Sequence, residues 1–207
     1  MNHLVLLMYI IHLVIGAAGA AAMALLHNRM GRKITAGLLW VMVCLLVSVL
    51  LNLVQYYIVS NLHILPIYMY VQYSLGLVTA LALYGGLLYV MMQLKEVPRP
   101  AAVIATAAVA AVQVGRLLLV IIGPPEWVAR MRFPSILLIS LYLFFLGLVL
   151  FRSVRSERDE NLSFLLKRLS ILTLIFAPAS TVFYFISYRL PVMERLHISL
   201  DFIYFSL

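Results

Sequence analysis

Residues 101–123 read AAVIATAAVAAVQVGRLLLVIIG, an apolar run that is interrupted by a single charged side chain, Arg116. Its length matches the roughly 20 apolar residues that a helix needs to cross the hydrocarbon core of a bilayer. A charged group at the centre of such a helix costs at least about 2.5–3.5 kcal/mol on insertion scales, so it usually serves a function or a partner. This stretch therefore predicts a membrane-spanning helix with a polar feature inside the bilayer.

Similar runs fill most of the chain, in which 65% of the 207 residues are hydrophobic and 11% are charged, so a soluble globular domain is excluded. Six complete spans are predicted, at about 4–26, 35–59, 67–93, 101–123, 134–152 and 169–188. A seventh begins near His197 and is cut off at Leu207 after about 16 Å, roughly half of the hydrocarbon core. We expect one all-α integral membrane module over residues 1–207, a seven-transmembrane helix bundle with a truncated seventh helix (197–207), and more protein beyond it.

The distribution of basic residues predicts the orientation of this bundle. No Lys or Arg precedes the first span, which therefore does not read as a signal peptide. Connections one, three and five carry ten Lys and Arg, whereas the N-terminus and the even-numbered connections carry four. The positive-inside rule then places the N-terminus outside and the odd-numbered connections in the cytoplasm of a multi-pass protein of the cell inner (plasma) membrane. The net charge of +8 is mostly explained in this way and does not indicate nucleic-acid binding.

Polar side chains gather in the predicted outer halves of the helices, while inner stretches such as LALYGGLLYVMM and AAVIATAAVA are nearly featureless. Many of these side chains recur every three or four residues, which places them on one face of a helix. Because a polar face is unfavourable in lipid, these faces should turn inward and line an outward-opening ligand cavity. The predicted lining residues are His12, Asn52, Gln55, Tyr56, Gln72, Gln113, Arg116, Tyr184, Tyr188, His197 and Asp201. An interfacial aromatic belt and interhelical hydrogen bonding are the alternatives.

Arg116 and Asp201 are the two charged side chains inside predicted spans, at compatible depths. A structural ion pair, a pair that a ligand opens or closes, and an Arg116 that reaches the surface all remain open. Pro178 predicts a kink in the sixth span, and the small-residue runs GAAGAAA (16–22) and Gly85-Gly86 predict close helix contacts.

No motif for catalysis is present: there is no Gly-x-Ser-x-Gly and no carboxylate pair inside the spans, so we expect no enzyme, no cofactor and no metal. His197 and Asp201, with His3 and His63, bear a weak similarity to the site of zinc-dependent membrane amidases, a remote alternative. A small-solute transporter is the main alternative. Seven-helix sugar transporters share the size and orientation, but their Pro-Gln signature is missing, and the inner halves lack the polar lining that alternating access needs.

The outside N-terminus, the seven spans with short loops and the aromatic stretch ISLDFIYFSL (198–207) resemble the seven-helix sensor modules of bacterial one-component regulators. In that family a LuxR-type helix-turn-helix follows the last helix, and related modules precede histidine kinases. The resemblance implies a receptor that binds a small extracytoplasmic ligand and signals through helix seven to a cytoplasmic, DNA-binding domain. The expected partners are the lipid bilayer, the ligand, and DNA only through that further domain, with a homodimer left open.

Overall fold

The computed structural model describes residues 3–62, 66–94, 97–123 and 125–189, and this part of the chain consists of helices and short connections, without a strand. Its helices are α1 (His3–Met30), α2 (Lys33–Leu62), α3 (Pro66–Gln93), α4 (Arg99–Ile122), α5 (Pro125–Val154) and α6 (Glu160–Arg189). All six are long and apolar enough to cross a membrane. The protein is therefore an all-α chain with the character of a multi-pass membrane protein.

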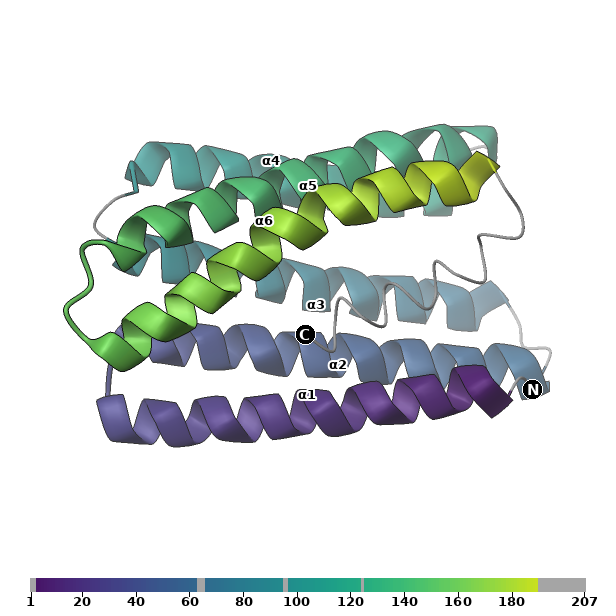
Figure 1. Ribbon diagram of the computed structural model, residues 1–207. Coiled ribbons are helices and arrows are strands. Elements are labelled where there is room, and N and C mark those ends of the chain that lie inside the picture. Colours follow the sequence, from purple (N-terminus) through teal and green to yellow (C-terminus); the bar gives the residue numbers. More distant parts are fainter. Residues whose placement is uncertain (1–2, 63–65, 95–96, 124, 190–207) are drawn as a thin grey trace.

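The helices run lengthwise beside one another, and each packs mainly on its neighbours in sequence (Figure 1). The connections α1–α2, α3–α4 and α5–α6 gather at one end of the bundle, which we call the odd end, and the α2–α3 and α4–α5 connections lie at the even end. Helix α6 starts near the α1–α2 turn at the odd end and diverges from α1 and α2 toward the even end (Figure 1). The three connections that together carry ten Lys and Arg residues thus share one end of the molecule.

The six complete spans predicted from the sequence are confirmed as helices, and the bounds of α1 to α4 differ from the prediction by a few residues. Helices α5 and α6 begin nine residues earlier than predicted, at Pro125 instead of 134 and at Glu160 instead of 169. Their first turns are polar, and hydropathy detects only the part of a helix that suits hydrocarbon. Pro134 and Pro178 lie inside α5 and α6, and the predicted kink at Pro178 stays a prediction. The predicted seventh helix lies outside the described residues.

Local sequence signals define the helix ends at the odd end. Gly31 follows α1 with φ of 60°, a left-handed conformation that favours glycine, and its N–H donates to the carbonyl of His27 at 2.7 Å. Asp159 precedes α6, and its Oδ1 accepts hydrogen bonds from the backbone N–H groups of Asn161 and Leu162 at 3.0 and 3.2 Å. This is the side-chain cap that leaves fewer free N–H groups at a helix start.

The tightest packing of the described side chains lies in the half of the bundle near the odd end. Met91 of α3, Ala102 of α4 and Leu166 of α6 are fully buried, and they belong to one cluster that also includes residues of α2 and α5. Large apolar side chains on the outside, such as Ile104 (68% exposed), suit contact with lipid tails. The odd end is therefore a packed protein core, surrounded by an apolar surface.

Two adjacent glycines of α3 differ in what surrounds them. A Cβ on Gly86 would lie 2.6 Å from Trp40 Cδ1 of α2, whereas a Cβ on Gly85 would meet nothing within 4 Å. The close approach at Gly86 brings Trp40 Nε1 within 3.0 Å of the Ala82 carbonyl oxygen, to which it donates a hydrogen bond. The predicted close contact is thus confirmed for Gly86 and not for Gly85.

The run 16–22 makes a second close approach, between α1 and α2. A Cβ on Gly16 would lie 3.1 Å from Leu46 Cδ1, and one on Gly19 would lie 2.7 Å from Met42 Cε. Small residues thus let both α1 and α3 approach α2 closely, as is common between membrane helices.

Replacing Gly86 by Leu tests this packing, and Gly85→Leu is the matched control because it adds the same side chain one residue away. Gly86→Leu should lower the free energy of unfolding by about 1–3 kcal/mol, since the larger side chain must displace Trp40. Gly85→Leu should change it by less than about 0.5 kcal/mol. Denaturant titration of the purified protein in mixed micelles measures both values. Equal losses in the two variants would contradict the proposed α2–α3 contact.

Candidate functional site

Arg116 lies on the inward-facing side of α4. Ala102, Thr106, Val109, Gln113 and Arg116 are spaced by four and three residues and so form one stripe along this helix. The first three are buried and the last two are half-buried, whereas residues on the opposite side, such as Leu118, are exposed. Gln113 and Arg116 therefore face the neighbouring helices, as their spacing predicts.

Two buried tyrosines face this stripe from α3 and α5. The rings of Tyr84 and Tyr142 meet edge to face, with centroids 5.8 Å apart. Thr106 Oγ1 donates its hydrogen to the Ala102 carbonyl at 2.8 Å, so at 3.1 Å from Tyr142 Oη it must accept the tyrosine's hydrogen. On the other tyrosine, Gln113 Nε2 donates to Tyr84 Oη at 3.4 Å. Three helices are thereby joined through hydroxyl and amide groups.

The polar groups of this cluster extend along the bundle from Arg116 toward the odd end. Ten residues separate Arg116 from Thr106, which corresponds to about 15 Å along α4, or half of a ~30 Å hydrocarbon core. Arg116 lies three residues after Gln113 on the same stripe, and Gln113 donates to Tyr84, so the charged group continues the row of hydroxyl and amide groups. We call Thr106, Tyr142, Tyr84, Gln113 and Arg116 the polar line.

Sequence reasoning missed the inner part of the polar line. Tyr84, Thr106 and Tyr142 lie in stretches that look apolar, and no other hydroxyl lies three or four residues from any of them to mark a polar face. The available signal was the position of Thr106, seven residues before Gln113 and ten before Arg116 on the same face of α4.

A separate polar contact joins α5 and α6. The hydroxyl groups of buried Ser140 and half-buried Thr181 are hydrogen-bonded, and Thr181 Oγ1 also lies 3.2 Å from the Ala177 carbonyl oxygen. Thr181 therefore lies on the side of α6 that faces α5. The side chains of Tyr184 and Tyr188, which continue this face in the sequence, are outside the described part of the structure.

The structure does not bring all the predicted lining residues together. His12 is half-buried on α1 and Asn52 is exposed on α2. Helix α1 packs on α2 and α2 packs on α3, whereas α4 packs on α3 and α5. Of the remaining predicted residues, Gln55, Tyr56 and Gln72 have side chains that are not described, and His197 and Asp201 lie outside the described residues. The Arg116–Asp201 pair stays a prediction. Among the described side chains, no carboxylate lies at ion-pair distance from Arg116.

Within the described residues, no three His, Cys, Asp or Glu side chains are grouped so that they could hold a metal ion. His197 and Asp201, on which the remote zinc alternative depends, are not among them.

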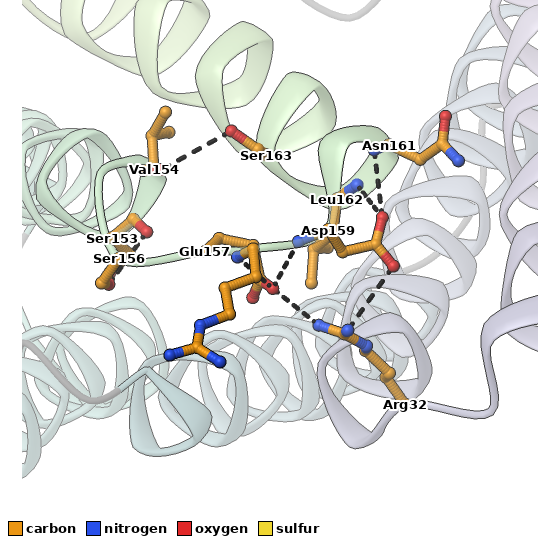
Figure 2. A network of polar contacts seen from close by, with 10 residues as sticks. Arg32, Ser153, Val154, Ser156, Glu157, Asp159, Asn161, Leu162 and Ser163 are labelled. Atoms are coloured by element: carbon orange, nitrogen blue, oxygen red, sulfur yellow. Dashed lines mark hydrogen bonds and ion pairs between the residues drawn. The ribbon is translucent and has the colours of Figure 1, made fainter.

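A second polar cluster lies at the odd end and joins the α1–α2 turn to the α5–α6 connection (Figure 2). Arg32 Nη1 lies 2.8 Å from Glu157 Oε1, and Arg32 Nη2 lies 3.5 Å from Asp159 Oδ2. Partial burial raises the pKa of Glu157. Other effects lower this pKa by more, so that it lies below its usual value. They are the hydrogen bond from Arg32, the hydrogen bonds from the N–H groups of Asp159 and Arg158, and the charge of Arg32. Both partners are thus held in their charged forms.

Comparison with known proteins gives no match: no family model fits the chain, and no curated protein and no solved structure is found to be similar to it. Functional conclusions therefore depend on the helices, the polar line and the cluster at the odd end.

The hydrogen bond between Thr106 and Tyr142 can be tested with a double-mutant cycle that uses Thr106→Val and Tyr142→Phe. Hydrogen bonds between membrane helices typically contribute about 0.6 kcal/mol and at most about 1.7 kcal/mol, so a coupling energy in this range is expected from denaturant titrations in micelles. The control cycle pairs Thr106→Val with Tyr89→Phe, because Tyr89 is an exposed tyrosine of α3, and it should show no coupling. A coupling near zero in the first cycle would contradict the contact.

Proposed function

We propose that the protein is a membrane receptor that binds a small, carboxylate-bearing apolar ligand at Arg116, in the half of the bundle near the even end. The observation that carries this proposal is the half-buried position of Arg116 on the inward-facing stripe of α4, with no carboxylate of the described chain at ion-pair distance. A guanidinium in hydrocarbon requires an anionic or hydrogen-bonding partner, and its planar fork suits a carboxylate.

Asp201 and a carboxylate ligand are the two candidate partners, and the receptor mechanism uses both. In the unliganded protein Asp201 pairs with Arg116, and the ligand carboxylate replaces it on binding. In this proposal such exchange alters the position of the seventh helix predicted from the sequence, which passes the change to a cytoplasmic domain. A ligand shifts this equilibrium only because it binds one state more tightly than the other.

The arrangement of the described helices supports a site near the even end. Most of the buried residues among the described side chains lie in the half near the odd end, and α6 diverges from α1 and α2 toward the even end (Figure 1). The half near the odd end thus holds the described core cluster, and Arg116 lies on the other side of the bundle's middle. This asymmetry fits a receptor that takes its ligand from one side of the membrane.

A transporter is the second candidate. The polar line weakens one of the arguments against it that come from the sequence. The expected lack of polar groups in the inner halves was an argument against transport, but Thr106, Tyr84 and Tyr142 lie there. However, Tyr142 is 3% exposed and Thr106 6%, and their hydroxyl groups bond to each other. We therefore assign these residues to helix packing and keep the receptor as the conclusion.

The orientation that this function needs is tested by cysteine accessibility in a Cys44→Ala background. Arg158→Cys places a thiol in the exposed α5–α6 connection, and Ile122→Cys places one at the opposite end, where Ile122 is 79% exposed. An impermeant maleimide added to intact spheroplasts should label Ile122→Cys at once and Arg158→Cys only after lysis. The reverse result would place the odd end outside and contradict the proposed receptor.

The ligand class is tested with apolar acids and their uncharged amides, namely leucine, phenylalanine and octanoate against leucinamide, phenylalaninamide and octanamide. At least one acid should raise the Tm of the purified protein more than its amide does, because ligand binding stabilises the folded state. Arg116→Gln should weaken binding of that acid by about 10-fold or more, since hydrogen bonds to charged groups contribute about 1.5–3 kcal/mol.

Lys33→Gln is the matched control, because it removes an exposed positive charge at the odd end, and it should bind the acid as the unaltered protein does. If no acid stabilises the protein more than its amide, or if Arg116→Gln binds the acid equally well, no carboxylate site exists at Arg116. If sealed proteoliposomes that contain the protein take up the acid and protein-free liposomes do not, the protein is a transporter instead.

A further inference from the structure

The ion pairs of Arg32 join two parts of the chain that are 125 residues apart. On one side is the two-residue turn between α1 and α2, and on the other is the connection 155–159 between α5 and α6 (Figure 2). Neither α1 nor α2 is among the helices on which α6 packs extensively. The ion pairs of Arg32 directly join the α1–α2 turn to the α5–α6 connection.

The turn presents Arg32 in a fixed position. Gly31 allows the left-handed backbone that ends α1, and the Thr35 hydroxyl donates to the Arg32 carbonyl at 2.7 Å. Because that hydroxyl hydrogen is used, His27 Nδ1, at 2.9 Å from Thr35 Oγ1, must be the donor in their contact. The backbone on both sides of Arg32 is thereby held through fully buried Thr35.

The carboxylates that face Arg32 are also held by their own backbone. Glu157 Oε1 accepts from the N–H groups of Arg158 and Asp159 at 3.0 and 3.1 Å. Asp159 uses Oδ1 to cap α6 and Oδ2 to face Arg32. Loss of Arg32 thus leaves the cap of α6 and the local hydrogen bonds of the connection in place.

The energetics of the contact differ from those of the neighbouring core. The side chains of Arg32, Glu157 and Asp159 are 41%, 22% and 28% exposed, and partly exposed ion pairs contribute little stability and are screened by salt. By contrast, Leu162 and Leu166 of α6 are 1% and 0% exposed within the core. The ionic contact can open at small free-energy cost while the first turns of α6 stay packed.

We propose that Arg32, Glu157 and Asp159 form a releasable ionic latch that holds the 155–159 connection against the α1–α2 turn. When the latch is open, the connection separates from the turn, and α6 remains anchored through Leu162 and Leu166. The latch is a property of the bundle itself and does not depend on the ligand site at Arg116.

Distances between pairs of spin labels in the purified full chain test the latch in a Cys44→Ala background. The reporter pair is Arg29→Cys with Ser156→Cys, which places one label on α1 and one in the connection, both at exposed positions outside the ion pairs. The reference pair is Arg29→Cys with Lys167→Cys, whose second label lies on the exposed side of α6. Arg32→Gln should add a longer-distance population to the reporter pair and leave the reference pair unchanged.

Lys33→Gln and Glu160→Gln are matched controls, because each removes one exposed charge next to the latch without touching its ion pairs, and neither should add this population. The protein with Arg32 intact should show the same longer population in 1 M KCl, so the test does not depend on the folding of the variant. A reporter distance that is unchanged in Arg32→Gln overturns the latch. A change of similar size in the reference pair also overturns it, because α6 would then have moved or unfolded.

Discussion

A polar group inside hydrocarbon has to find its partner within the protein, and this constraint shapes the interior of the bundle. Most hydroxyl groups in the described helices meet it locally: Thr79, Ser153 and Thr173 each donate to the carbonyl four residues earlier in their own helix. Thr106 does the same, which leaves its oxygen free to accept from Tyr142. Arg116 cannot be satisfied in this way, since a guanidinium has five N–H donors and carries a charge. Of the residues in the described interior, it is therefore the one that most needs a hydrogen-bonding or anionic partner from outside its own helix.

The two halves of the bundle differ in what their described side chains contribute. Near the odd end, apolar side chains from α2 to α6 form one buried cluster, and the ionic contact of Arg32 lies just outside it. The cluster provides stability through close van der Waals packing between helices, because lipid tails are as apolar as these side chains and burial alone contributes little. The ionic contact positions the α5–α6 connection at the α1–α2 turn but contributes little to the free energy of unfolding. Arg116 lies on the far side of this packed region, where a partner that binds or leaves need not disturb it.

The sequence predicts the helices better than the contacts between them. Spans such as 101–123 are found to within a few residues because apolar length is a direct requirement of the bilayer. The polar first turns of α5 and α6 escape such a prediction, since a helix that continues into water has no hydropathic signature. Spacing places Gln113 and Arg116 on the inward side of α4, whereas only the rotation of α3 distinguishes Gly86 from Gly85. The pairing of Arg32 with Glu157 has no local signal, because 125 residues lie between them.

The serial packing of the helices also has a consequence for the order in which the protein is made. Contacts between neighbours in sequence can form as each hairpin leaves the ribosome, because little chain has to be ordered to bring them together. The contact of Arg32 is different, since its acidic partners are synthesised only after five helices. Until then, Arg32 has no ion pair with Glu157 and Asp159. Its place in a turn at the end of the bundle lets water solvate the unpaired guanidinium, whereas an unpaired charge in hydrocarbon would be costly.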